Sequence, residues 1–434
     1  MKCKFKSILA LAIALVMCVT MLPAAFAADT DRTPDPNGWD GTTTAAIPHE
    51  GNTYTISTPE QLARLAVDVN KGTNYSGKTV VLANDINLNY RSFTPIGTWN
   101  GLLSRRGFKG VFDGNNHTIR NANISGHGTN SNGIIRAGLF GYVHEGRVEN
   151  LVLEDIVVIN DSTSNSGNSL QNYKESATGI AVATLESGTI SNVSTTTNCS
   201  VEGHLRTGGI VGDIRKSSLV TGCNNNAKVT GKNMYTGGIV GAAHDVSANL
   251  SDMGSTIQNC NNYAEVDAQN QTNVGGIVGY ADRTTVSNCE NAGKITGTGN
   301  YGTGGIMGCC ALNNNYTTPG NDPKACVIDT CKNKGVVVGG RAGGIMGAFV
   351  LAPSCDAPTE YTVVCKIISC DNSGAISGTN GVCGAIYGKS ITYKTGADPD
   401  TMVVSLEGTN TNTGTVCGAN PGDNFGPFTA PTNS

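Results

Sequence analysis

The chain of 434 residues is poor in charged and aromatic side chains. Asp, Glu, Lys and Arg make up 14% of it, against about 25% in an average globular chain, and aromatic residues make up 6%. The formal net charge is −4, and three of the lysines lie within the first six residues. Because the sequence has no basic stripe or patch, it argues against nucleic acid or anionic lipid as a partner.

Histidine is scarce as well, and the six present are scattered. A zinc peptidase needs two histidines four residues apart with a glutamate beside the first, so that one helical face can hold the metal. Neither His49-Glu50 nor His144-Glu145 has a second histidine at that spacing. We therefore expect no zinc peptidase, no metal site and no cofactor.

Only one long apolar run is present, and it lies at the N-terminus. Lys2, Lys4 and Lys6 precede the apolar stretch 8–22, and Ala25-Phe26-Ala27 forms a small-x-small cleavage site. This is the pattern of a secretory signal peptide over residues 1–27. With no second run of membrane-spanning length and no wall-sorting signal, we expect a secreted protein, free or associated with the cell surface, without membrane insertion after cleavage.

Glycine, by contrast, is abundant, and much of it lies in a repeated phrase. Five copies with the pattern Gly-Gly-Ile-(Val or Met)-Gly begin at Gly208, Gly237, Gly275, Gly304 and Gly343. A degenerate copy begins at Gly384, and looser copies begin at Ala137 and Thr178. The copies begin 29 or 30 residues apart where the repeat is shortest and 38 to 41 apart elsewhere. A repeat of this kind predicts an array of stacked units.

A second phrase lies between the glycine phrases. It consists of Val or Ile, two residues, a cysteine, one residue and an asparagine, and its cysteines are Cys223, Cys260, Cys289, Cys331 and Cys370. A short β-branched segment follows each copy, so one repeat offers three short strands with Gly and Asn corners and no helical periodicity. We predict an all-β fold, a right-handed three-faced parallel β-helix (a solenoid). A propeller would need about 40 or more residues in every repeat.

Stacking equivalent positions predicts interior ladders of side chains. One ladder contains the isoleucine of every glycine phrase, and another contains the Val or Ile before each cysteine. Asparagine suits the corners because it tolerates left-handed backbone and can form hydrogen bonds along the stack. The five cysteines should form a buried thiol ladder, because free cysteine behaves as a small hydrophobic residue.

A helix is predicted ahead of the repeats. Thr58 suits the N-cap, Pro59 the first turn and Gln61 the capping-box position. One face of this helix contains Leu62, Leu65, Ala66 and Val69. Such a helix would cover the open end of the stack, whose unpaired strand edge would otherwise recruit other chains.

From residue 58 onward the sequence resembles a known family. The segments TPEQLARLAVDVNKG, GKTVVLANDINL, FKGVFDGNNHTIRN and AGLFGYV resemble the opening of bacterial proteins with GLUG-motif repeats, and the glycine phrases resemble the motif itself. The resemblance covers about residues 52–390. Relatives include adhesin-like surface proteins and the non-catalytic part of immunoglobulin-A-cleaving metallopeptidases. The resemblance implies a right-handed β-helix that acts outside the cell, and it implies no common active site.

Pectin-degrading enzymes also use the β-helix, so a polysaccharide-active enzyme is the main alternative. Gly126-His127-Gly128 matches one polygalacturonase motif, but the companion Asp-Asp pair is absent. Asp213-Ile214-Arg215-Lys216 offers an acid and two bases, but it follows a glycine phrase where a turn is expected. Asp113 and His117 lie in a turn of the resembled family, where a structural role is expected.

Three insertions lengthen the repeats, at residues 242–256, 309–327 and 348–366. All follow a glycine phrase directly, so we expect their loops to project from one side of the stack, where recognition residues commonly lie. Candidate ligand-binding residues in them are Tyr316, Tyr361, His244, Asp245 and Asp322. Cys309, Cys310 and Cys326 bracket one loop and Cys355 and Cys365 another, which suits disulfide closure.

The sequence therefore predicts an adhesin-like binding protein whose ligand is a host or matrix glycan or protein. A polysaccharide-active enzyme and a purely structural surface spacer are the alternatives. The predicted organisation is a signal peptide (1–27), a linker (28–51), a capping helix with the first coils (52–136), GLUG-type repeats (137–389), and a last coil with a tail (390–434).

Overall fold

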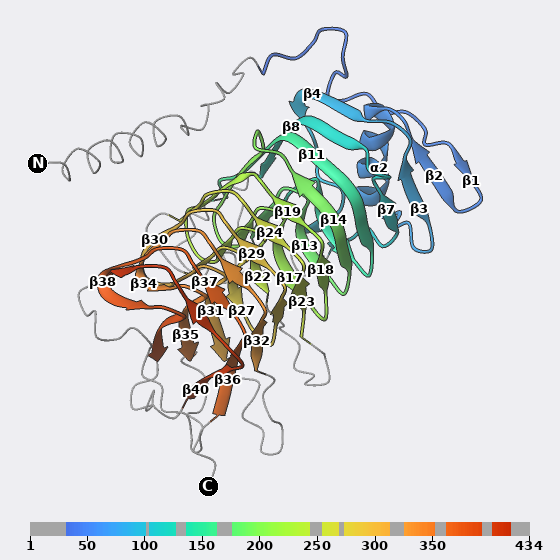
Figure 1. Ribbon diagram of the computed structural model, residues 1–434. Helices are drawn as coiled ribbons and strands as arrows, with labels where there is room; N and C mark the ends of the chain where they lie inside the picture. Colours follow the sequence, from blue (N-terminus) through green and yellow to red (C-terminus); the bar gives the residue numbers. More distant parts are fainter. Residues whose placement is uncertain are drawn as a thin grey trace, which may run out of the picture. The chain divides into compact units, whose positions relative to one another are not determined.

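The structure, a computed structural model, describes residues 32–100, 104–126, 136–162, 176–243, 254–268, 273–312, 325–351, 362–392 and 402–417. Residues 34–434 form one compact unit. In its described part almost all regular structure is β, and α2 (Pro59–Lys71) is the helix. Strands of successive repeats pair in parallel, coil upon coil, as Figure 1 shows from blue to red. The predicted parallel β-helix with three faces is confirmed.

The first face is a parallel sheet to which each of eight coils contributes one strand. Its strands are β10 (Phe140–His144), β13 (Val182–Glu186), β17 (Val211–Arg215), β22 (Val240–Ala243), β27 (Val278–Ala281), β31 (Met307–Leu312), β35 (Met346–Leu351) and β39 (Tyr387–Thr392). The first, third and fourth residues of neighbouring strands pair directly. For example, Val211 pairs with Val240, and Val240 pairs with Val278. The glycine phrase therefore leads each coil into this sheet.

The second face contains the strand before each cysteine and a two-residue strand after it. These strands are β14 (Thr189–Thr195), β18 (Leu219–Thr221), β19 (Asn224–Asn225), β23 (Thr256–Gln258), β24 (Asn261–Asn262), β28 (Thr285–Ser287), β29 (Glu290–Asn291), β32 (Cys326–Asp329), β33 (Lys332–Asn333), β36 (Thr362–Ile368), β37 (Asp371–Asn372), β40 (Met402–Glu407) and β41 (Thr411–Asn412).

The third face holds the β-branched segment of each repeat and returns the chain to the next glycine phrase. Its strands are β12 (Ala177–Gly179), β15 (Ser200–Gly203), β16 (Thr207–Gly208), β20 (Lys228–Gly231), β21 (Thr236–Gly237), β25 (Val266–Ala268), β26 (Val274–Gly275), β30 (Ile295–Gly304), β34 (Val337–Gly343), β38 (Ile376–Gly384) and β42 (Val416–Cys417).

The first coils are less regular and lie next to α2. Their strands are β1 (His49–Glu50), β2 (Thr53–Ile56), β3 (Thr79–Leu82), β4 (Ile86–Ser92), β5 (Thr98–Asn100), β6 (Ser104–Arg106), β7 (Val111–Asp113), β8 (Thr118–Gly126), β9 (Arg136–Ala137) and β11 (Arg147–Asn160). Strands β1 and β2, and β5 and β6, are antiparallel pairs, whereas β2, β3, β7 and β11 pair in parallel. The stack therefore begins well before the first close copy of the repeat.

The isoleucine ladder is confirmed. Its members are almost completely buried, and they are Ile210, Ile239, Ile277, Ile306, Ile345 and Ile386. The backbone N–H of each of the first five donates to the carbonyl of the equivalent isoleucine one coil on, at 2.8–3.1 Å. The apolar residues before the cysteines are also fully buried, and they are Val220, Ile257, Val286, Ile328 and Ile367. These ladders bury apolar surface along the stack and supply its main stabilisation.

The asparagine after each cysteine forms a third ladder inside the stack. The Nδ2 group of Asn262 donates to Oδ1 of Asn291 at 2.8 Å, and Nδ2 of Asn291 donates to Oδ1 of Asn333 at 2.8 Å. Each of these amides also donates to a carbonyl two residues on, for example Gly293 O at 3.0 Å. The predicted hydrogen bonding of asparagine along the stack is confirmed.

The asparagine ladder explains the second glycine of the repeated phrase. A Cβ added to Gly276 would lie 2.4 Å from Cγ of Asn291 and 2.1 Å from the carbonyl oxygen of Gly305. The equivalent glycines meet the same two neighbours in their own coils. The phrase therefore contains glycine there because the corner backbone packs directly against the buried amide.

The residue before each ladder cysteine turns the chain between the two strands of the second face. It has a positive φ in those five coils, at Gly222, Asn259, Asn288, Thr330 and Ser369. Asn150, Asn192 and Gly408 have a positive φ at the equivalent position of coils without this cysteine. Asn and Gly are favoured there because they adopt left-handed backbone at least cost.

Helix α2 has the predicted caps and buried face. The side chain of Thr58 accepts from Gln61 N, and the side chain of Gln61 accepts from Ser57 N at 2.7 Å. Leu62, Leu65, Ala66 and Val69 are buried, as predicted. The helix contacts β2, β4 and β6. It therefore packs against the first coils.

Candidate functional site

Three of the repeats leave the stack on the same edge of the first face. Strands β31, β35 and β39 are consecutive neighbours, and their ends are in register, with Leu312 opposite Leu351 and Leu351 opposite Thr392. Strand β22 ends at Ala243 in the same sheet, two coils earlier. The predicted common exit side is confirmed for these strand ends.

The exits lie later in the chain than the sequence predicted. Insertions were expected from residues 309 and 348, whereas β31 continues to Leu312 and β35 to Leu351. The segments Cys309–Leu312 and Ala348–Leu351 are apolar and pair directly with each other across the coils. Pairing of these residues extends both strands past the positions where the insertions were expected to begin.

The predicted ligand-binding residues Tyr316, Tyr361, His244, Asp245 and Asp322 lie outside the described residues, as does Cys355. Their role in binding stays a prediction, and so does the pairing of Cys355 with Cys365. Cys365 itself is a buried free thiol, in register with Cys326 on the neighbouring coil.

The predicted thiol ladder is confirmed. All five of its cysteines are buried and form no disulfide, and they are Cys223, Cys260, Cys289, Cys331 and Cys370. The backbone N–H of Cys260 donates to Sγ of Cys289 at 3.4 Å, so the ladder is continuous from coil to coil. Cys309 and Cys326, which were expected to suit loop closure, are free thiols within strands, and Cys310, of which the same was expected, is buried in β31. Burial raises the pKa of the Cys309 thiol, and a protonated thiol is a poor nucleophile.

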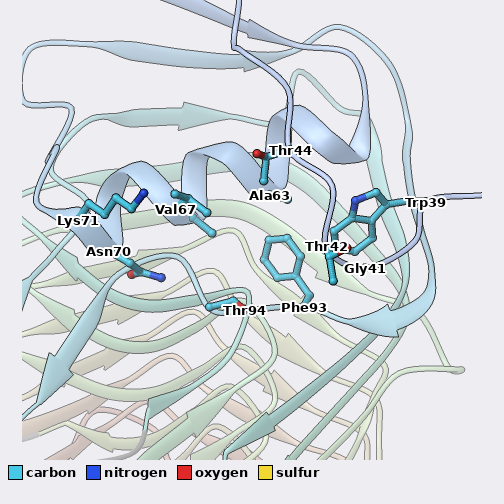
Figure 2. A pocket seen from close by; sticks show the side chains of 11 residues that line it. Trp39, Gly41, Thr42, Thr44, Ala63, Val67, Asn70, Lys71, Phe93 and Thr94 are labelled. Carbon is cyan, nitrogen blue, oxygen red and sulfur yellow. The ribbon is translucent and has the colours of Figure 1, made fainter.

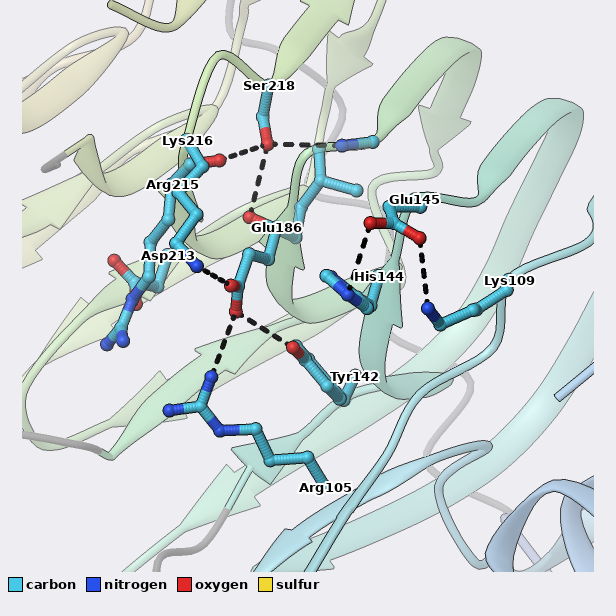
Figure 3. Close-up of polar contacts among 12 residues, drawn as sticks. Arg105, Lys109, Tyr142, His144, Glu145, Glu186, Asp213, Arg215, Lys216 and Ser218 are labelled. Carbon is cyan, nitrogen blue, oxygen red and sulfur yellow. Dashed lines mark hydrogen bonds and ion pairs between the residues drawn. The ribbon is translucent and has the colours of Figure 1, made fainter. Parts of the chain in front are cut away.

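Polar side chains gather on the outward side of the first face, over β10, β13 and β17 (Figure 3). Tyr142, Thr184 and Asp213 are register partners, as are His144, Glu186 and Arg215. The residues between them, Val143, Leu185 and Ile214, are buried among the hydrophobic core. Because successive side chains of a strand point to opposite faces, the charged and polar residues form rows on one side of the sheet and the apolar residues form a row on the other.

Glu186 is the centre of this group. Its side chain, only 2% exposed, accepts from Tyr142 Oη at 2.8 Å and pairs with Lys216 Nζ at 2.6 Å and with Arg105 Nη1 at 3.8 Å. Burial by itself raises the pKa of Glu186, but the hydrogen bonds from Lys216 and Tyr142 outweigh it and lower the pKa below its usual value. Burial and the charge of Glu186 raise the pKa of Tyr142. Glu186 is therefore ionised and Tyr142 protonated at neutral pH.

Asp213 and Arg215 lie in strand β17, which corrects the turn expected at this position. The chain continues as a strand because Ile214 fills the interior row. Arg215 Nε donates to Asp213 Oδ2 at 2.6 Å, and Arg206 Nε lies 3.7 Å from Oδ1. Lys216, the third charged residue of the segment, pairs with Glu186 rather than with Asp213. The ion pair of Lys216 with Glu186 joins two neighbouring coils.

This arrangement does not resemble a general acid and base pair. A glycosidase needs one carboxyl group whose raised pKa keeps it protonated. Each described carboxylate with a resolved pKa shift has a lowered pKa, including Glu186, Glu145 and Asp85. Asp113 accepts from Asn115 N at 2.8 Å and from Asn150 Nδ2 at 3.0 Å, so the expected structural role in a turn is confirmed. His127 of the predicted polygalacturonase-like motif lies outside the described residues.

Among the described residues, no group of three or more His, Cys, Asp or Glu side chains is arranged to hold a metal ion. In the same part of the chain, none of the helices has the length and apolarity that crossing a membrane requires.

The lowered pKa of Glu186 leads to a pH-dependent contribution to stability. Stabilisation by a carboxylate with a depressed native pKa is present above the unfolded value of about 4.3 and is lost as pH falls through the native pKa. We expect Glu186→Gln to lower the free energy of unfolding by about 1–3 kcal/mol at pH 7, because charge-assisted hydrogen bonds are lost. The wild type should lose more stability than the variant between pH 6 and pH 3.

Urea unfolding at several pH values measures this difference. Glu202→Gln is the matched control, because Glu202 is 36% exposed and pairs with the exposed Lys232. It should change stability by less than about 1 kcal/mol, as is usual for surface ion pairs. Parallel pH profiles for Glu186→Gln and the wild type would contradict the assigned ionisation.

A hollow of about 300 Å³ lies beside α2 (Figure 2). Five of its lining residues form one stripe of the helix, and they are Ala63, Ala66, Val67, Asn70 and Lys71. The remaining lining residues come from the segment before β1 and from the end of β4 onward, and they are Trp39, Gly41, Thr42, Thr44, Phe93 and Thr94.

The walls of this cap hollow are held by hydrogen bonds. The indole N–H of Trp39 donates to the carbonyl of Thr43 at 2.9 Å, and the ring centre lies 6.2 Å from that of Phe93. The amide of Asn70 donates to Pro95 O at 3.0 Å and accepts from Gly97 N at 2.9 Å. Hydrogen bonds to the backbone therefore fix the side chains of Trp39 and Asn70 in these walls.

Sequence reasoning missed both the Glu186 group and the cap hollow. The repeat register does align residues 142, 184 and 213, so the polar row was open to prediction once the first face had been recognised as a strand. No pattern in the sequence indicated the hollow, because its lining comes from three separate segments: residues 39–44, helix α2 and residues 93–94.

The chain carries a GLUG motif. Residues 270–296 match the profile of that motif, and this stretch runs through β26, β27, β28 and β29, which together make one coil. The resemblance predicted from the glycine phrases is thus confirmed, and the chain is a repeat protein of parallel β coils.

Two other proteins are similar over longer stretches. The chain is 28% identical to halomucin of Haloquadratum walsbyi over 239 residues, which are 46% of this chain and 2% of halomucin. The chain therefore spans a small part of that relative. A proposed immunoglobulin A1 protease from Bacteroides ovatus has a similar solved structure, with a TM-score of 0.41, 18% identity, and coverage of 89% of this chain and 87% of that one.

Proposed function

We propose that this is a secreted or surface-associated, adhesin-like binding protein that recognises a host or matrix glycan or protein. The observation that carries the proposal is the register of the strand ends on the first face. Leu312, Leu351 and Thr392 end consecutive strands. Neighbouring strands lie about 4.8 Å apart, so segments that follow these residues start side by side on a rigid base. Rigid scaffolds that present several loops at one edge are well suited to recognition.

Location outside the cell is part of the same proposal. The signal-peptide pattern over residues 1–27 supports it. The similarity to halomucin over part of the chain and the GLUG motif support it as well. A non-enzymatic role is supported by the lowered pKa of Glu186, which keeps this paired carboxylate ionised at neutral pH, and by the ion pair of Asp213 with Arg215. A polysaccharide-active enzyme and a structural spacer remain the competing proposals.

Replacing residues 313–324 and 352–361 by short turns tests the proposal. We expect the stack to survive, because β27 and β28 are joined by residues 282–284 without any insertion, and surface loops contribute little to stability. The far-ultraviolet circular dichroism and the thermal midpoint should change little. Binding to a ligand found by screening mucins, immunoglobulins and a glycan array should fall at least tenfold.

A variant with only residues 163–175 shortened is the control, because that segment follows β11 and does not leave from the first face. It should bind like the wild type. Full binding after both replacements would place recognition on the faces of the stack, and hydrolysis of a glycan by the wild type would favour the enzyme.

A further inference from the structure

The cap hollow combines an apolar floor with a polar rim. Ala63, Ala66 and Val67 line it on the helix side, and Phe93 and Trp39 are further apolar lining residues. Phe93 and Trp39 are almost completely buried, at 2% and 5% exposed. The volume of about 300 Å³ is at the lower end of the range for small-molecule sites.

Several polar groups at the rim have no bonding partner within the described residues. The hydroxyls of Thr44 and Thr94 make no hydrogen bond there, and the ammonium of Lys71 makes no ion pair there. Thr42, by contrast, donates its backbone N–H to Oδ1 of Asp40 at 2.7 Å. The rim thus offers one cation and two hydroxyl groups above an apolar surface.

These groups match the chemistry of one kind of ligand. A pyranose ring has an apolar C–H face and hydroxyl groups around its edge, which suits an apolar floor bordered by hydroxyls. The unpaired ammonium of Lys71 adds a preference for an anionic substituent, since a charge-assisted hydrogen bond to a carboxylate is about twice as strong as a neutral one.

We infer that the cap hollow binds a single carboxylated pyranose, such as the uronic acid unit of an acidic glycan. Lys71 pairs with the carboxylate, Thr44 and Thr94 bond the ring hydroxyls, and Val67 and Ala63 contact the C–H face. The inference shares a ligand class with the proposed function, but its site lies on the helical cap and not on the loops that leave the first face.

Titration of the mature protein, residues 28–434, with methyl β-glucuronide tests the inference by calorimetry or by ligand-observed NMR. We expect saturable binding, and binding of methyl β-glucoside about tenfold weaker. Lys71→Gln should weaken glucuronide binding about tenfold and remove the preference over the glucoside. Val67→Phe fills the hollow and should abolish binding of both sugars.

Lys294→Gln is the matched control, because Lys294 is similarly exposed and lies on the repeats, and it should leave glucuronide binding unchanged. If Val67→Phe fails to fold, the Lys71→Gln comparison still decides, because that side chain is exposed. Absence of glucuronide binding, equal binding of the two sugars, or unchanged binding by Lys71→Gln would each overturn the inference. Replacing residues 313–324 and 352–361 should leave glucuronide binding intact, so failure here and failure of the proposed function are separable.

Discussion

Replacing Ile277 by aspartate is expected to lower the free energy of unfolding by at least about 4 kcal/mol and to open the stack at its middle coils. Ile277 is fully buried, and its backbone links Ile239 on one side to Ile306 on the other. Its described neighbours in the ladder are isoleucines, so a carboxylate there must be buried either charged or protonated. Either state costs far more than the removal of a methyl group.

The position at which the Ile277→Asp variant unfolds can be measured as well as the loss of stability. Repeat arrays are stabilised mainly between nearest neighbours, so a lesion in one coil should leave the distant coils folded. Limited proteolysis should then cut the Ile277→Asp variant near residue 280 and release two protected fragments. The control Lys294→Asp, at a side chain 55% exposed, should keep the wild-type pattern. Identical digestion of the two variants would show that the assigned ladder is wrong.

Replacing Asn291 by aspartate is expected to cost roughly 3 kcal/mol or more, although the two side chains have nearly the same shape. The amide of Asn291 donates to Asn333 Oδ1 at 2.8 Å and to Gly293 O at 3.0 Å. A carboxylate has no donor, so two buried acceptors lose their partner and meet a negative charge. Asn262, which donates to Asn291, keeps its bond.

The Asn291→Asp variant should also depend on pH in a defined direction. Burial among acceptors raises the native pKa of the new carboxyl group above the unfolded value of about 3.9. The protonated form can donate again, so the loss of stability should be smallest below about pH 4 and should grow as pH rises. Thermal midpoints at pH 4 and pH 8, compared with the wild type at each pH, measure this change.

The chain itself supplies a control for this substitution. Asn52 is exposed, and its Oδ1 accepts from Nζ of Lys78 at 2.7 Å. An aspartate at this position still accepts from Lys78, so Asn52→Asp should change stability by less than about 1 kcal/mol at either pH. Equal losses for the two variants would contradict the buried amide ladder.

The interior rows were predictable from the sequence alone. A fixed repeat places the isoleucine, valine and cysteine positions opposite their copies, whatever the shape of each corner, because register follows from the spacing. The caps of α2 were predictable for the same kind of reason, since they depend on residues within three positions of one another. Loop exits were predicted on the correct side but a few residues early. Apolar residues 309–312 and 348–351 gain more from pairing than from leaving the sheet.

The candidate sites depended on contacts between segments far apart in the chain. Glu186 meets Tyr142, Lys216 and Arg105 only after three coils have stacked, and the state of its carboxyl group depends on burial that no local pattern encodes. The cap hollow likewise needs α2, Trp39 and Phe93 together. The sequence by itself determined the repeating coil, its interior ladders and its helical cap, because those follow from periodicity and short-range spacing. The tertiary structure decided which charges pair and where a hollow remains, because these depend on how side chains of separate coils pack in space.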